Sequence, residues 1–94
     1  MFSKQEFKNI DKNYFNVLCL STYYVDIKSK NTGHSWSIYS QQLDYKHRTL
    51  VIRHKHRDQD PYHEQLRYHP KNLIDAQEMI KAHDKWHLAG RKRH

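Results

Sequence analysis

Residues 72–88 constrain the fold most, because they are the one long stretch of the chain with a clear helical period. One side of this helix would carry mainly apolar side chains and two histidines: Leu73, Ala76, Met79, Ile80, His83, Trp86 and His87. The other side would carry Asp75, Gln77, Glu78, Lys81, Asp84 and Lys85. We therefore predict an amphipathic helix that covers a core with its first side and meets solvent with its second.

The ends of this helix carry their own signals. Pro70 suits a first helical turn, whereas Asn72 offers a later start as an N-cap. Gly90 favours a stop. Residues 91–94 are then a basic tail near the negative end of the helix dipole, with the cations Arg91, Lys92 and Arg93.

Length and charge limit the function. A chain of 94 residues fits one small α+β domain over residues 1–94, with little room for a large enclosed active site. The formal net charge of +7 favours anionic partners. No apolar run is long enough to span a bilayer and no apolar leader precedes the first predicted helix, so we expect no membrane segment and a cytoplasmic location. The single cysteine, Cys19, excludes an internal disulfide and is expected to be a buried, inert thiol.

The first half of the chain predicts a short helix followed by strands. Ser3 and Glu6 have the spacing of a capping box, and Phe2 and Phe7 that of a hydrophobic staple, which predicts a helix over residues 4–12. Residues 14–29 alternate as one strand that is apolar on both faces at first and on one face later. A turn at residues 30–33 and a strand over residues 34–41 complete a β-hairpin.

The alternation continues after a polar connection. Residues 49–57 form the clearest strand pattern, with Leu50 and Ile52 on the inner face. Residues 62–69 fit either a short fourth strand or an ordered loop. The predicted fold is therefore an α+β domain of α-β-β-β-α order: an antiparallel meander of three or four strands, with the C-terminal helix on one face and the short N-terminal helix beside it.

The open sheet face is the stronger functional signal. Residues 46–57 contain five Lys or Arg, three His and no acid. A row of cations along a strand can follow a phosphate backbone, and tyrosines on the same face can stack on bases. The predicted nucleic-acid-binding residues are Tyr24, Lys28, Tyr39, Arg53, Lys55, Arg57, Arg91, Lys92 and Arg93. A solvated face that protects an edge, or a face for an acidic protein partner or a second copy, are the alternatives.

This order of elements is similar to that of two nucleic-acid-binding architectures. The double-stranded-RNA-binding fold has the order α-β-β-β-α. The domains of a three-stranded sheet and a helix at the N-termini of some mobile-element integrases place an open sheet face in the DNA major groove. Both are likenesses of fold alone and imply DNA or RNA as the ligand.

The histidines are the second signal. His34, His54, His56, His83 and His87 all fall on faces predicted to point inward. His54-x-His56 on a strand and His83-x3-His87 on a helix have the spacing of metal ligands. Residues 83–87 resemble the H-E-x-x-H motif of metalloproteases with Asp84 in place of Glu. Partly buried histidines that bond Tyr or backbone groups are the alternative, and we predict no bound cofactor.

Catalysis has a single candidate pattern. His34 after Gly33, at the head of a strand, resembles the strand-borne histidine of small toxin ribonucleases, but the Gly-Thr-Leu opening of that family's last helix is missing. Two glycines cannot build a glycine-rich phosphate loop. The sequence therefore predicts a small, basic, non-enzymatic protein that contacts a nucleic-acid backbone. A protein-interaction or homodimerisation module is the alternative, ahead of a histidine-cluster metal-binding protein or a ribonuclease.

Overall fold

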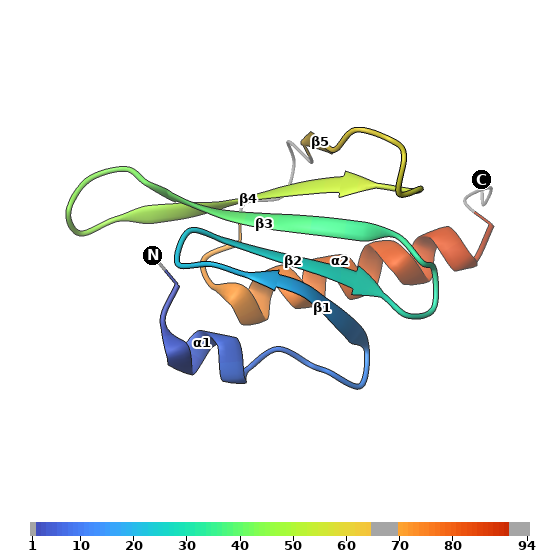
Figure 1. The fold of residues 1–94 in the computed structure, drawn as a ribbon, viewed down its shortest axis with the longest axis horizontal. Coiled ribbons are helices and arrows are strands. Elements are labelled where there is room, and N and C mark those ends of the chain that lie inside the picture. The colour runs from blue at the N-terminus through green and yellow to red at the C-terminus, as the bar shows by residue number, and fades with distance from the viewer. Residues whose placement is uncertain (1, 65–69, 91–94) are drawn as a thin grey trace.

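The computed structural model describes residues 2–64 and 70–90, in which five strands form one antiparallel sheet with meander order. The strands are β1 (Phe15–Leu20), β2 (Tyr24–Ser29), β3 (Ser35–Gln42), β4 (Arg48–Lys55) and β5 (His63–Glu64). Helix α2 (Leu73–Leu88) runs along one face of the sheet, and the short helix α1 (Lys4–Lys8) lies on the β1 side (Figure 1). The predicted α+β class, the meander and both helices are confirmed.

The single strand predicted over residues 14–29 is wrong, because the chain reverses in its middle. Ser21 N–H donates to Tyr24 O (2.9 Å), and Leu20 pairs with Val25. The turn contains neither Gly nor Pro, and its residues continue the alternating pattern of the two strands. The local sequence therefore gives no sign that the chain reverses there. Strands seldom exceed about ten residues, which was the one sequence signal against a strand of that length. The sheet therefore has five strands instead of three or four.

A β-bulge changes the direction of the Cys19 side chain. The pairing of β1 with β2 shifts between Val17 and Cys19, so that Cys19 pairs with Asp26. Cys19 is exposed, and its Sγ lies 3.8 Å from Tyr24 Oη on the open sheet face. The buried thiol predicted from the apolar run is wrong, because strict alternation does not survive the bulge.

Both helices begin at the residues that the capping signals indicate. Ser3 Oγ accepts from Glu6 N–H and Glu6 Oε1 accepts from Ser3 N–H, both at 3.2 Å, and α1 ends at Lys8, earlier than the predicted residue 12. Asn72 is the N-cap of α2 and accepts from Asp75 N–H (2.8 Å). Of the two predicted starts, the later one is therefore correct.

The remaining strands lie close to their predicted ranges. Gly33 has φ +76° in the turn before β3, a conformation that favours glycine. Residues 63–64 of the uncertain 62–69 stretch form β5 against β4. Residues 65–69 and the basic tail at 91–94 lie outside the described residues.

The core lies between α2 and the inner face of the sheet. Alternate residues of three neighbouring strands supply its buried side chains: Val25, Ile27, Trp36, Ile38, Leu50 and Ile52. From α2 come Leu73, Ala76 and Ile80, and Phe2, Ile10 and Phe15 close the β1 side. The alternation of β2, β3 and β4 thus predicted the buried face correctly.

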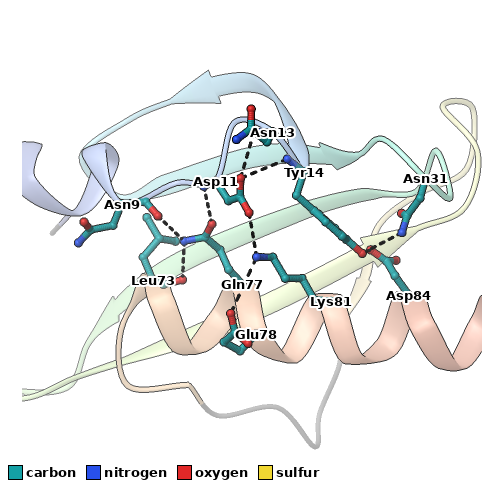
Figure 2. A network of polar contacts seen from close by, with 10 residues as sticks. All are labelled: Asn9, Asp11, Asn13, Tyr14, Asn31, Leu73, Gln77, Glu78, Lys81 and Asp84. Atoms are coloured by element: carbon teal, nitrogen blue, oxygen red, sulfur yellow. Dashed lines mark hydrogen bonds and ion pairs between the residues drawn. The ribbon is translucent and has the colours of Figure 1, made fainter.

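Helix α2 is rotated from the predicted orientation. Gln77 and Asp84, predicted to face solvent, are buried, whereas Trp86, predicted to face the core, is 51% exposed. The reason is a second partner for the helix, the segment before β1 (Figure 2). Gln77 Oε1 accepts from Asp11 N–H (2.8 Å), and Lys81 pairs with Asp11 Oδ2 at 3.0 Å. The apolar stripe alone could not show this second buried face.

Within the described residues, no helix is long and apolar enough to cross a membrane.

Candidate metal centre

Histidines from the sheet and from α2 meet at one end of the molecule. His34 precedes β3, His54 lies in β4, and His56 follows β4. The ring centroid of His54 is 5.0 Å from that of His83, and the ring centroid of His56 is 5.5 Å from that of His87. The two pairs with ligand-like spacing in the sequence therefore come together in space.

The register of the central hairpin explains the part of this cluster that lies on the sheet. Ser35 pairs with Lys55 and Trp36 pairs with His54, so the next step of the same register places His34 opposite His56. The His34 and His56 rings stack with centroids 4.2 Å apart and planes 5° apart. His34 and His54 are buried as predicted. His56 is exposed, in contrast to the prediction, because β4 ends at Lys55.

Three of these imidazoles can supply ligands to one ion. His34, His54 and His56 each offer a ring nitrogen, and these nitrogens lie within 4.8 Å of one another. His54 Nε2 and His34 Nδ1 are hydrogen-bonded at 3.2 Å. Two nitrogens on a tetrahedral zinc ion, each about 2.05 Å from the metal, are about 3.3 Å apart. The two buried rings thus already have the separation of two ligands.

Trp36 forms the floor under His54. The two rings are stacked with centroids 3.8 Å apart and planes at 12°. Trp36 is fully buried, and its Nε1–H donates to Ser29 Oγ (3.1 Å). A buried indole fixed by its own hydrogen bond leaves the stacked imidazole few orientations, which favours a preformed site.

The electrostatic environment keeps the two buried imidazoles neutral. Burial, followed by the repulsion of neighbouring histidines, lowers the pKa of His54 to about 3 and the pKa of His34 to about 4. Both rings are therefore unprotonated near pH 7. The neutral imidazole is the form that coordinates a metal.

Asp84 was predicted to face solvent, and its buried role in this region was not predicted. Its fully buried carboxylate accepts from Tyr14 Oη (2.8 Å) and from Thr32 Oγ1 (3.2 Å). Burial and this bond raise the pKa of Tyr14 to about 12. One signal in the sequence was available: positions 73, 77, 80, 84 and 87 are spaced by four and three, which is the period of a second buried stripe.

Of the residues predicted to bind nucleic acid, Tyr24, Lys28, Tyr39, Arg53 and Lys55 lie on strands as predicted, whereas Arg57 lies in the loop after β4, because that strand ends at Lys55. Tyr24 and Tyr39 are direct cross-strand partners, 38% and 40% exposed. Acids of the loop after β4 lie among the cations: Lys28 pairs with Asp58 at 3.2 Å and Arg57 with Asp60 at 3.3 Å.

Two more of the predicted cations meet polar or acidic groups of the same region. Lys55 Nζ donates to Asp58 O (3.2 Å), and Arg53 stands opposite Glu64 in the register. The positive row is thus interleaved with negative charge. Arg91, Lys92 and Arg93 lie outside the described residues.

Comparisons with protein-family models, with curated proteins and with solved structures find no match for this chain.

Proposed function

We propose that the protein binds a divalent transition-metal ion through His34, His54 and His56. The observation that carries this proposal is the convergence of three ring nitrogens within 4.8 Å, two of them on buried, neutral imidazoles. A ligand set made only of imidazoles suits Zn²⁺, Cu²⁺, Ni²⁺ or Co²⁺ and disfavours Mg²⁺ and Ca²⁺, which prefer oxygen. The proposed ion is therefore Zn²⁺, Cu²⁺, Ni²⁺ or Co²⁺.

Helix α2 offers the fourth ligand. The half-buried ring of His87 has its centroid 4.5 Å from that of His34. Rotation of this side chain would bring a fourth nitrogen to an ion held by the three sheet histidines. Sheet and helix would then be joined by the metal, and binding of the ion would stabilise the fold.

The test is a titration of chelator-treated protein with Zn²⁺ in competition with a chromophoric chelator, repeated with Co²⁺ and monitored by its visible absorption. We expect one ion per chain with a Kd of about 1 μM or lower. His34→Gln and His54→Gln should each raise the Kd at least about tenfold. His47→Gln is the matched control, because His47 lies in the exposed loop at the opposite end of β3 and β4. Absence of binding, or equal effects of all three variants, would overturn the proposal.

Nucleic-acid binding by the open face is the second candidate, favoured by the exposed Tyr24–Tyr39 pair on a chain of net charge +7. Fluorescent single- and double-stranded DNA and RNA would be titrated at about 50 and 200 mM salt, and binding through phosphates should weaken steeply at the higher salt. Arg53→Glu plus Lys55→Glu should abolish this binding. Lys4→Glu plus Lys8→Glu on the exposed face of α1 makes the same change in charge and should have a smaller effect.

No binding at the lower salt would remove the nucleic-acid proposal. A protein partner or a second copy of the chain would then be the remaining occupant for the open face.

A further inference from the structure

A buried carboxylate on α2 is tied to the turn that carries His34. The structure describes Asp84 as fully buried, with both carboxylate oxygens hydrogen-bonded to residues far away in the sequence. Oδ2 accepts from the hydroxyl of Tyr14, and Oδ1 accepts from the hydroxyl of Thr32. A buried donor that loses its acceptor costs free energy. The two bonds to Asp84 therefore hold the hydroxyl groups of Tyr14 and Thr32 in place.

The bond to Thr32 continues to His34. A hydroxyl group has one proton to donate and two lone pairs that accept. Thr32 Oγ1 donates to Asp84 and accepts from His34 N–H (3.1 Å). The His34 carbonyl in turn accepts from Ser29 N–H (2.9 Å). Both backbone polar groups of His34 are thus fixed, one of them by a chain of bonds that begins on the helix.

The bond to Tyr14 leads to the segment before β1. Tyr14 precedes β1, and its Oη also accepts from Asn31 Nδ2–H (3.1 Å). The Tyr14–Asp84 bond fixes the same carboxylate without contacting His34 or its backbone. It therefore provides an internal comparison for the bond to Thr32.

We propose that Asp84, acting through the Thr32 hydroxyl, is a positioning residue that holds His34 in the orientation required for metal binding. This inference rests on the proposed metal site, and it assigns to Asp84 and Thr32 a role in setting the affinity of that site for the ion. Neither residue is a ligand. Hydrogen-bond partners that orient a ligating imidazole through its ring typically contribute about ten- to a hundredfold in metal affinity, and for this backbone relay we expect a contribution near the lower end of that range.

Three variants separate positioning from general stabilisation. Thr32→Val removes the hydroxyl at nearly constant shape, and Thr32→Ser retains it. Tyr14→Phe removes the other bond to Asp84 together with the bond from Asn31. The readouts are the Zn²⁺ Kd, the Co²⁺ absorption spectrum and the melting temperature of the metal-free protein. We expect Thr32→Val to raise the Kd about tenfold, Thr32→Ser to restore it, and Tyr14→Phe to change it less than about twofold while lowering the melting temperature.

A double-mutant cycle tests the Asp84 end of the relay. Asp84→Ala should raise the Kd about as much as Thr32→Val, and the double variant should be no worse than either, because all three break the same chain of bonds. If Asp84→Ala does not fold, Thr32→Val, Thr32→Ser and Tyr14→Phe decide alone. A Kd that follows the melting temperature equally in Thr32→Val and Tyr14→Phe would overturn the proposal.

A measurement without metal distinguishes failure of this inference from failure of the proposed function. The ring ¹⁵N chemical shifts of His34 report its tautomer and its hydrogen bond to His54. We expect them to change in Thr32→Val and to remain in Tyr14→Phe. If the unmodified protein binds neither Zn²⁺ nor Co²⁺, the proposed metal binding is wrong. The ¹⁵N shifts then still show whether the bonds from Asp84 through Thr32 position His34.

Discussion

Gln77 shows how one amide side chain can join two segments of the protein. Its Oε1 accepts from Asp11 N–H (2.8 Å), and its Nε2 donates to Asn9 O (3.0 Å). Figure 2 shows these bonds between α2 and the segment before β1. Gln77 is only 3% exposed, although its polarity predicted a solvent-facing position. A buried amide of this kind is tolerated because both of its polar atoms are satisfied.

Replacement of Gln77 by Leu should destabilise the protein by about 2 kcal/mol, because the Asp11 N–H and Asn9 carbonyl groups lose their partner. Urea-induced unfolding measures this loss. The matched control is Lys85→Leu, a polar-to-Leu change at an exposed site of the same helix, which should stay within about 0.5 kcal/mol. Equal effects of the two variants would show that the amide bonds contribute nothing specific.

Among the single elements, helix ends marked by capping residues were predicted correctly, whereas a turn without such residues was not. The α2 boundaries were predictable because Asn72 and Gly90 mark them with their own backbone chemistry. The β1–β2 turn was not, because Ser21 and Thr22 sit within an alternating pattern without glycine or proline. A turn that is fixed by pairing of its flanking strands leaves only a weak trace in the local sequence.

The cap of α2 gives an element-level prediction. Asn72→Ala removes the acceptor of the Asp75 N–H group and should lower the free energy of unfolding by about 1 kcal/mol. The exposed neighbour Lys71→Ala, outside the cap, serves as control and should have little effect. Chemical denaturation of both variants measures the difference. If Asn72→Ala leaves the free energy of unfolding unchanged, water replaces the N-cap bond at no cost in stability.

For the whole molecule, the layered arrangement was predictable but the histidine cluster was not. Strand alternation showed which face each histidine occupies, and that part is confirmed for His34 and His54. Whether His54 meets His83, and His56 meets His87, depends on where α2 lies along the sheet and how it is rotated. Contacts of the buried Gln77 and Asp84 help to fix both quantities, and although the helix spacing hints that these residues are buried, it does not show which residues they contact.

Acid should destabilise the metal-free protein as a whole. Burial lowers the pKa of His34 to about 4 and the pKa of His54 to about 3, so the unfolded chain binds more protons than the folded chain once pH falls below about 6.5. This part of the stability is present above that pH and is lost progressively as pH decreases toward the folded values.

Thermal melts in the presence of a chelator between about pH 7 and pH 5 measure the effect, with an expected decrease of about 5 °C or more. His54→Gln should flatten the profile. The control His47→Gln should not, because its side chain is 70% exposed. A flat profile for the original chain would contradict clustered, buried histidines.

The bonds between the segment before β1 and α2 join residues 66 to 70 positions apart in the sequence. The hairpins, in contrast, pair neighbouring strands and can form as each second strand is synthesised. During synthesis, the apolar face of the sheet therefore stays uncovered until residues 73–88 have left the ribosome and formed α2. During that interval the nascent chain exposes Trp36, Ile38 and Ile52 to other chains, which makes it vulnerable to aggregation.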